Sequence, residues 1–365
     1  MSFSSADHAF MARALQLARN GLFTTTPNPR VGCVMVRDGR VIGEGWHEKA
    51  GGPHAEAAAL NAIVGAGDTA NGATAYVTLE PCSHFGRTPP CADALIAAGV
   101  ARVVAAMRDP NPLVAGQGLA RLAAAGIEVA SGLLEADAAE LNIGFVSRMT
   151  RGRPWLRLKV AASLDGKTAL NNGVSQWITG PDARRDAHAW RARSCAVLTG
   201  IGTVKDDNPR LTAREVDTPR QPLKVVIDSR LETPPGAAVL DGGNVLIVAA
   251  QDDPARSAVL RECGAEIVVL PNAQGKVELT ALMQELGRRG INEVLAEAGT
   301  RLNGSLLREG CVDELLIYQA PLLIGDAARG MFGLAELTDL SGARRLDIFE
   351  RRSVGADFRI RARLG

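Results

Sequence analysis

The feature that most constrains the fold of this chain is a set of four side chains whose chemistry suits one site. His54 and Glu56 fall in the first turn of one expected helix, and Cys82 and Cys91 flank a loop that leads into the next. Zinc prefers nitrogen and sulfur ligands, and a catalytic zinc keeps one coordination position open. We therefore expect two helix N-termini to converge on one point, where their partial positive charge favours thiolates.

These four residues predict a hydrolytic zinc site. A His/Cys/Cys zinc beside a Glu that is not a ligand is typical of nucleobase deaminases, in which zinc activates water and the Glu carries the proton. We predict His54, Cys82 and Cys91 as the zinc ligands and Glu56 as the catalytic residue.

Two alternatives to a catalytic zinc stay open on the residues alone. The usual deaminase signature has two residues between its cysteines, whereas residues 83–90 separate Cys82 from Cys91 here. A structural zinc would use a fourth protein ligand, for which His47 and His84 are the nearby candidates. A core histidine with two buried thiols is the other alternative.

The first half of the chain alternates expected strands and helices, which predicts an α/β sandwich. Asp7 is a candidate cap for the first helix. The expected helices are 5–20, 54–66 and 91–98, and the expected strands are 31–36, 41–46, 74–79 and 102–106. Asn28 lies in the Pro-rich loop before the first strand, and its amide can read a pyrimidine edge or a ribose hydroxyl.

The chain of 365 residues is long for one core, so we expect two domains. A basic, Gly- and Pro-containing joint at 148–154 places the boundary between 1–148 and 149–365.

The second half predicts another α/β sheet with helical crossovers. The expected strands are 155–161, 195–199, 224–228, 244–249, 266–270, 293–296 and 314–319, and the expected helices are 181–193, 254–263, 277–289 and 302–309. Gly-containing turns follow two of these strands, at 199–204 and 297–305. Such turns at helix starts cradle phosphate, so a dinucleotide is the expected ligand.

Composition argues against polymers and membranes as partners. The net charge of +1 and an aromatic content of 4% do not suit a nucleic-acid surface. No apolar run reaches about 18 residues, and the N-terminus lacks the pattern of a signal peptide. Sparse cysteines favour the reducing cytoplasm. An apolar, Gly-rich second half leaves room for a homo-oligomer, a dimer or a tetramer.

Taken together, the motifs resemble the RibD family of riboflavin-biosynthesis proteins, in which a pyrimidine deaminase is fused to a reductase. The N-terminal resemblance is carried by residues 27–32, 54–56 and 81–91, and the long spacer between the cysteines agrees with this family. The C-terminal resemblance is carried by residues 158–159, 162–167, 175–179, 206–209 and 297–299.

The resemblance implies a cytidine-deaminase-like α/β/α sandwich followed by a dihydrofolate-reductase-like α/β domain. It also implies two reactions on one phosphoribosyl pyrimidine. The first is zinc-dependent deamination of 2,5-diamino-6-(5-phosphoribosylamino)pyrimidin-4-one, and the second is NADPH-dependent reduction of the ribosyl chain of 5-amino-6-(5-phosphoribosylamino)uracil.

The resemblance further implies which residues bind NADPH and substrate. The NADPH site would comprise Ala161, Trp177, Thr203, Asp207, Ser229, Gly299, Thr300, Arg301, Leu302, Asn303, Gly304 and Ser305. The substrate would be bound by Asn28, Lys159, Ser175, Arg191, Leu211, Arg214 and Glu297. The other function classes that the sequence leaves open are a tRNA adenosine deaminase with an RNA-binding second half and a non-enzymatic zinc-stabilised binding module.

Overall fold

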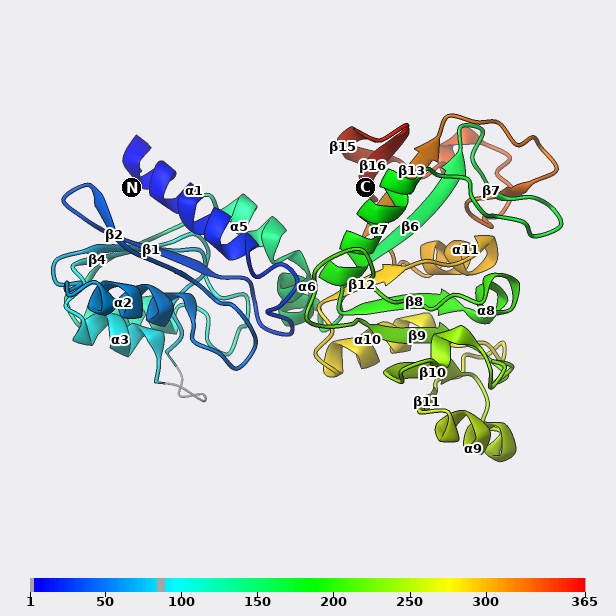
Figure 1. The fold of residues 1–365 in the computed structure, drawn as a ribbon, viewed down its shortest axis with the longest axis horizontal. Helices are drawn as coiled ribbons and strands as arrows, with labels where there is room; N and C mark the ends of the chain where they lie inside the picture. The colour runs from blue at the N-terminus through cyan, green and yellow to red at the C-terminus, as the bar shows by residue number, and fades with distance from the viewer. Residues whose placement is uncertain (1–2, 84–88, 365) are drawn as a thin grey trace. The chain divides into compact units, whose positions relative to one another are not determined.

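The computed structural model describes residues 3–83 and 89–364, and the chain divides into two compact units, Met1–Gly152 and Arg153–Gly365 (Figure 1). The boundary expected after residue 148 lies inside helix α6 (Ile143–Arg151), which ends at Gly152 in the left-handed conformation. Within the described residues, no helix is both long enough and apolar enough to cross a membrane.

The first unit is built on a five-stranded sheet in the order β2-β1-β3-β4-β5. β1 pairs antiparallel with both β2 and β3, whereas β3, β4 and β5 are parallel. The strands are β1 (Gly32–Arg37), β2 (Arg40–Trp46), β3 (Thr74–Val77), β4 (Arg102–Ala105) and β5 (Glu128–Ser131). The last of these was not predicted.

Helices cover both faces of this sheet. A side chain at Gly32 would collide with α1, and one at Gly45 would collide with α2. Gly45 pairs with Cys33, the neighbour of Gly32, so the two glycines face opposite sides. Figure 1 shows α2 and α3 on one face and α1 and α5 on the other, which confirms the predicted sandwich. The helices are α1 (Ser5–Arg19), α2 (Ala55–Gly65), α3 (Cys91–Ala97), α4 (Gln117–Ala124) and α5 (Glu135–Leu141).

The N-cap of α1 differs from the sequence prediction. Ser4, not Asp7, is the capping residue, and its side chain accepts the Asp7 N–H. Asp7 completes a capping box by accepting the Ser4 N–H at 2.8 Å. The helix therefore begins at Ser5, two residues before Asp7.

The second unit contains a nine-stranded sheet in the order β11-β10-β9-β8-β12-β6-β13-β16-β15. Pairing is parallel from β11 to β13, and the antiparallel hairpin β16–β15 forms one edge. The strands are β6 (Trp155–Ser163), β8 (Ala196–Gly200), β9 (Leu223–Ile227), β10 (Val245–Ala249), β11 (Ala265–Val269), β12 (Glu293–Ala296), β13 (Glu314–Ala320), β15 (Leu346–Val354) and β16 (Asp357–Leu364). The pair β7 (Lys167–Ala169) and β14 (Arg329–Gly330) is separate.

Two apolar cores sandwich this sheet. Leu198 belongs to the core under α10 and α11, whereas its neighbour Val197 belongs to the core under α7 and α9. The helices are α7 (Pro181–Arg193), α8 (Ile201–Asp207), α9 (Pro254–Glu262), α10 (Leu279–Arg288) and α11 (Thr300–Arg308). This arrangement confirms the predicted α/β class for the second unit.

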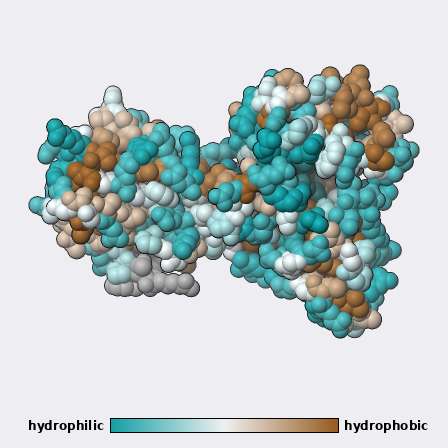
Figure 2. All heavy atoms as spheres, viewed as in Figure 1, coloured by the Kyte–Doolittle hydropathy of each residue, from teal (hydrophilic) through white to brown (hydrophobic). Residues whose placement is uncertain are grey.

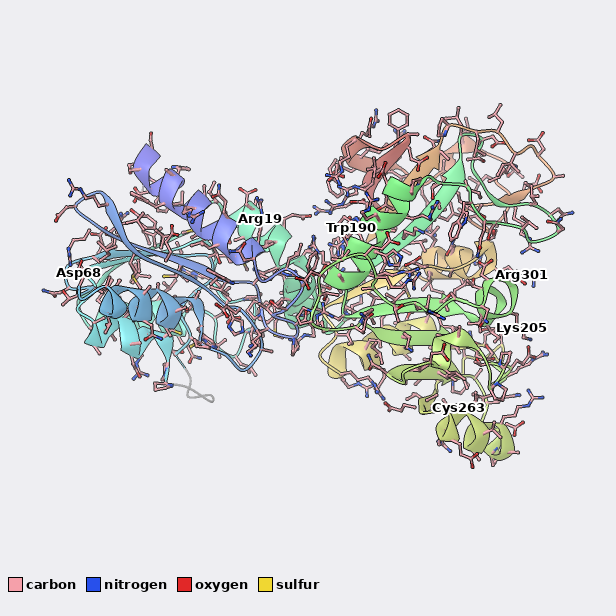
Figure 3. All side chains as sticks on the ribbon, viewed as in Figure 1. Arg19, Asp68, Trp190, Lys205, Cys263 and Arg301 are labelled. Atoms are coloured by element: carbon pink, nitrogen blue, oxygen red, sulfur yellow. The ribbon has the colours of Figure 1, made fainter. Side chains whose placement is uncertain are left out.

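Buried ion pairs tie together the amino ends of the central strands. Arg157 on β6 is fully buried and pairs with Glu293 on β12 and with Glu314 on β13, the latter at 2.9 Å. Trp190 of α7, labelled in Figure 3, lies beside the Arg157 guanidinium, whose carbon is 5.1 Å from the ring centre. The carboxyl ends of the same strands are left to form a site.

Candidate active sites

The structure brings His54, Cys82 and Cys91 together in the first unit. His54 is the N-cap of α2, Cys91 is the first residue of α3, and Cys82 follows β3. His54 Nδ1 lies 3.6 Å from Cys82 Sγ and 3.3 Å from Cys91 Sγ. Zn–N and Zn–S bonds of about 2.1 and 2.3 Å at a tetrahedral angle separate two such atoms by about 3.6 Å. The three side chains therefore fit a zinc ion.

The local backbone holds the two cysteines in place. The Cys91 N–H donates to Cys82 Sγ at 3.3 Å, and the Ala92 N–H donates to the Cys82 carbonyl at 3.1 Å. Hydrogen bonds from Cys91 lower the pKa of the Cys82 thiol well below its usual value, against the opposing effect of burial. This environment favours the thiolate that a metal requires.

Glu56 is a buried acid next to the ligands. It lies in the first turn of α2 with 3% of its surface exposed. Burial raises the pKa of its carboxyl group to about 7. A carboxyl group that titrates near neutral pH can both accept and release a proton during a reaction.

His47 is held away from the ligand cluster by its own hydrogen bonds. Its Nδ1 lies 2.8 Å from the Pro53 carbonyl, so it donates there, and its Nε2 then accepts from Asn28 Nδ2 at 3.0 Å. In residues 3–83 and 89–364, the one cluster of possible metal ligands is His54, Cys82 and Cys91. His47 is therefore not a fourth ligand, and His84 lies outside the described residues.

Asn28 and Glu56 line the same cavity, of about 550 Å³, at this site. The His47 ring fixes the orientation of the Asn28 amide and leaves its oxygen to accept another hydrogen bond. The loop that carries Asn28 is anchored by Arg30, whose N–H and carbonyl both bond to the Asn142 side chain. The cavity thus combines a metal site, a proton carrier and an oriented amide.

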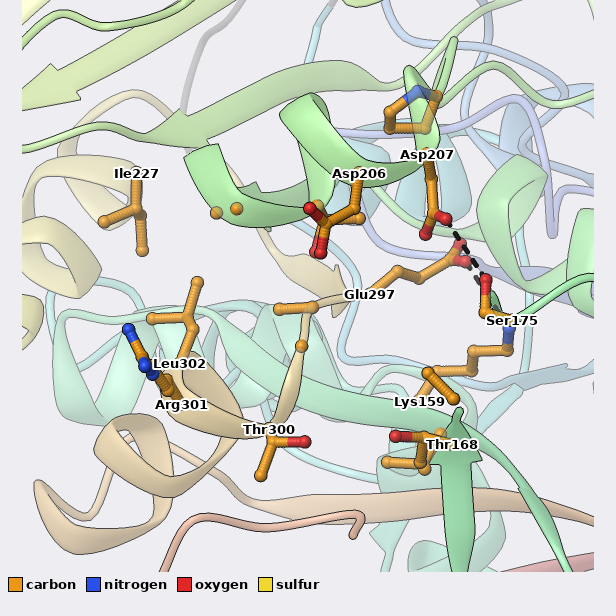
Figure 4. Close-up of a pocket in the computed structure, with 18 of the residues that line it drawn as sticks. Lys159, Thr168, Ser175, Asp206, Asp207, Ile227, Glu297, Thr300, Arg301 and Leu302 are labelled. Atoms are coloured by element: carbon orange, nitrogen blue, oxygen red, sulfur yellow. Dashed lines mark hydrogen bonds and ion pairs between the residues drawn. The ribbon is translucent and has the colours of Figure 1, made fainter. Parts of the chain in front are cut away.

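The second unit contains a much larger cleft, of about 2070 Å³, that opens beyond the carboxyl ends of β6, β8 and β12 (Figure 4). Ligand cavities of about 300–1,000 Å³ are usual, so this cleft has room for two ligands at once. Clefts at the carboxyl ends of parallel strands are the usual binding sites of open α/β sheets.

Two glycine turns meet in this cleft. Gly200 is the N-cap of α8 and Gly299 is the N-cap of α11. Their strands, β8 and β12, are neighbours, and a side chain atom added at Gly299 would lie 3.8 Å from Thr203 Oγ1. Helix starts with free N–H groups suit the phosphates of a dinucleotide.

A charged cluster occupies another part of the cleft. Glu297 pairs with Arg191, with Nη2 3.0 Å from Oε2, and with Lys159 at 3.5 Å. Burial alone would raise the pKa of Glu297, but these two cations lower it to about 2. Figure 4 shows Lys159 and Glu297 near the Ser175–Asp207 hydrogen bond, which is 3.1 Å long.

Most of the residues predicted for NADPH and substrate line this one cleft. They are Lys159, Ala161, Ser175, Trp177, Arg191, Thr203, Asp207, Leu211, Arg214, Ser229, Glu297, Gly299, Thr300, Arg301, Leu302 and Ser305. Asn303 and Gly304 do not, because they lie on the opposite side of α11. Asn303 Nδ2 donates to the Met331 carbonyl, and Gly304 packs against Gly333.

His188 is a further residue of the cleft that the sequence motifs did not predict. It lines the cleft, and its Nδ1 accepts the Arg214 N–H at 3.2 Å. Burial and the charges of Arg191 and Arg214 lower the pKa of His188 to about 4. His188 lies seven residues after Pro181, the first residue of α7, and the same helix carries Arg191. This shared helix was the sequence signal that could have identified His188 as a residue of the cleft.

The two sites define the class of the protein, a zinc-dependent hydrolytic deaminase joined to a dinucleotide-dependent reductase. The model of the cytidine and deoxycytidylate deaminase zinc-binding region matches residues 4–107, and the model of the RibD C-terminal domain matches residues 154–358.

Full-length relatives agree with this class. The riboflavin biosynthesis protein RibD of Escherichia coli K12 is 50% identical over 96% of this chain and 97% of its own. The Acinetobacter baumannii RibD structure has a TM-score of 0.91 at 43% identity, with 99% of both chains covered. The deaminase/reductase of Thermotoga maritima has a TM-score of 0.87 at 34% identity, again with 99% of both covered. The chain belongs to the RibD family, the bifunctional deaminase and reductase of riboflavin biosynthesis, whose cofactors are zinc and NADPH.

Proposed function

We propose that the first unit deaminates 2,5-diamino-6-(5-phosphoribosylamino)pyrimidin-4-one and that the second unit then reduces the ribosyl chain of 5-amino-6-(5-phosphoribosylamino)uracil. The proposal assigns deamination to residues 1–148 and reduction to 149–365. The observation that carries it is the convergence of His54, Cys82 and Cys91 beside the buried Glu56, in a unit separate from the dinucleotide cleft.

In the deaminase site, His54, Cys82 and Cys91 would hold zinc, which when bound would supply the Lewis acidity that makes water nucleophilic near neutral pH. Glu56 accepts the proton of that water and delivers it to the departing amino group. Its pKa of about 7 suits both steps. Asn28, oriented by His47, binds a polar edge of the pyrimidine.

In the reductase cleft, NADPH supplies the hydride, because protein side chains cannot. The turns that begin at Gly200 and Gly299 bind its phosphates, and Trp177 and Ser229 line the same cleft. Lys159, Arg191 and Arg214 bind the phosphate and sugar of the substrate. Glu297 keeps two of these cations in place through the ion pairs described above.

We also propose a cytoplasmic homo-oligomer. A reducing compartment suits the site, because Cys82 and Cys91 bind metal only as thiolates. Figure 2 shows hydrophobic side chains gathered near β7 in the second unit, and Leu164, Leu170 and Leu323 are exposed there. Exposed apolar clusters favour association. Light scattering of the purified protein would distinguish a dimer or tetramer from a monomer.

Incubation of the zinc-loaded protein with the diaminopyrimidine substrate tests the central proposal. We expect ammonia release without NADPH, and NADPH oxidation only after deamination. Glu56→Gln should retain zinc and should still reduce the deaminated intermediate, while its deamination rate falls by about 10²–10⁴-fold.

Glu135→Gln is the matched control, because Glu135 is an exposed acid in the same unit. It should behave as the unsubstituted protein does. Deamination that persists in Glu56→Gln would remove Glu56 from the mechanism, and failure of the unsubstituted protein to release ammonia would refute the assigned substrate.

A further inference from the structure

Glu80 is a buried acid beside the deaminase cavity whose role the mechanism above does not use. It follows β3, lies two residues before the ligand Cys82, and has 5% of its surface exposed. Ionised carboxylates are seldom buried without strong hydrogen-bond partners. The partners of Glu80 therefore indicate what it does.

Four backbone N–H groups donate to the Glu80 carboxylate. Oε2 accepts from Asp109 at 3.1 Å and from Gly116 at 2.9 Å. Oε1 accepts from Gly118 at 2.9 Å and from Leu119 at 3.3 Å. One side chain thus fastens both the beginning and the end of the segment 109–116.

Two of these hydrogen bonds cap the N-terminus of α4 with a side chain that is remote in the sequence. Gly116 is the N-cap of α4, and as a glycine it has no side chain to satisfy the first N–H groups of that helix. Glu80 accepts the Gly118 and Leu119 N–H groups instead, and its negative charge suits a helix N-terminus.

The start of α4 packs closely against the segment that carries Glu80. A side chain atom added at Gly118 would come within 1.9 Å of the Pro81 carbonyl oxygen. The start of α4 therefore lies directly against the peptide between Glu80 and Cys82. The segment that supplies a zinc ligand and the segment 109–116 are held as one body.

The clamped segment forms a wall of the deaminase cavity. Asp109 and Asn111 both line that cavity, as Asn28 does. Their turn is further ordered, since Asp109 Oδ1 accepts the Asn111 N–H at 2.8 Å. We infer that Glu80 is a positioning residue for deamination, which holds 109–116 as a fixed wall against the phosphoribosylamino pyrimidine. The inference rests on the proposed substrate.

Glu80→Gln tests it, because the variant keeps the size of the side chain but points an NH₂ group at two N–H donors. We expect the deamination KM to rise by about 10- to 100-fold, since only a fraction of molecules would hold the wall in place. The kcat at saturation, the zinc content and the reductase activity of the same chain should stay unchanged. Amide exchange at Asp109, Gly116, Gly118 and Leu119 should accelerate.

Two further variants keep the test decisive. Glu80→Asp, which retains both oxygens on a shorter side chain, should give a smaller rise in KM and carries the test if Glu80→Gln does not fold. Glu135→Gln should match the unsubstituted protein. An unchanged KM with unchanged exchange would overturn the inference, as would loss of zinc with an unaltered KM in the reloaded enzyme. Inactivity of the unsubstituted protein would instead refute the substrate assignment.

Discussion

Arg191 and Glu297 form a two-point ion pair inside the reductase cleft, with Nη2 3.0 Å from Oε2 and Nε bonded to Oε1. Arg191 comes from α7, and Glu297 directly follows β12. Their side chains are 15% and 12% exposed. A desolvated pair costs several kcal/mol to break, because one charge is left without its partner. The pair therefore fixes the cations around the proposed substrate.

Arg191→Lys tests this pair. Lysine retains the charge but not the planar fork, so we expect the reductase kcat/KM to fall about 30-fold or more, on the order of 2 kcal/mol. Arg185→Lys is the control, because Arg185 lies on the same helix and its side chain is 60% exposed. NADPH oxidation measures the reductase, and ammonia release from the same sample should not change. Equal losses in both activities would contradict a local role.

His188 predicts a pH dependence of stability in the second unit. Its pKa is lowered to about 4 from a usual 6.5, so the unfolded chain binds this proton more readily between those values. The contribution of His188 is therefore complete above about pH 6.5 and is lost as the pH falls toward 4. Between pH 7 and 4.5 it amounts to about 2 kcal/mol.

His188→Gln isolates that contribution, since the glutamine oxygen can still accept the Arg214 N–H. Urea unfolding followed by tryptophan fluorescence reports mainly on the second unit, which contains Trp155, Trp177 and Trp190. The free energy of unfolding should decrease less in the variant than in the unsubstituted protein as the pH is lowered. Equal decreases would show that His188 does not titrate in this range.

The metal site could be predicted from sequence because its chemistry is local. His54 and Cys91 stand at helix starts and Cys82 lies in the loop after β3, where short motifs determine the backbone. The role of His47 could not be predicted this way. Its nearness to His54 in the sequence made His47 a candidate fourth zinc ligand. In the structure its two ring nitrogens are hydrogen-bonded to Asn28 and Pro53, and only the folded loops determine these partners.

Boundaries and faces were harder to predict than the order of elements. The turn 297–305 was treated as one binding segment, but α11 begins at Thr300, so Asn303 and Gly304 rotate away from the cleft. The hairpin β15–β16 was missed, because the first of these strands is largely exposed and lacks the alternation of a half-buried strand. The role of Glu80 could not be predicted from the sequence, because its hydrogen-bond donors lie about 30 to 40 residues further along the chain.

Removal of zinc should separate the two activities. A chelator should abolish deamination, while reduction of the deaminated intermediate continues. The first unit should stay folded, because its core contains many fully buried side chains, such as Met35, Ile63 and Leu95. Circular dichroism before and after chelation, with activity restored by added zinc, measures both effects. Loss of helical signal on chelation would make the zinc structural rather than catalytic.

Gly45 determines how closely α2, which carries His54 and Glu56, approaches the sheet. A Cβ at Gly45 would lie 2.4 Å from the Ala59 nitrogen and 2.5 Å from the Ala55 carbonyl oxygen. Both are backbone atoms, so the whole helix would have to shift. We expect Gly45→Ala to destabilise the first unit by about 1–3 kcal/mol and to weaken zinc binding, since the shift moves one ligand away from the two cysteines.

Gly65→Ala is the matched control, because Gly65 lies on the same helix and an added Cβ there would meet no atom within 4 Å. Alanine favours helix over glycine by up to about 1 kcal/mol, so this variant should be as stable as the unsubstituted protein or more so. Thermal unfolding and competition for zinc with a coloured chelator measure the two effects. Equal zinc affinity in both variants would show that the position of α2 on the sheet does not control the metal site.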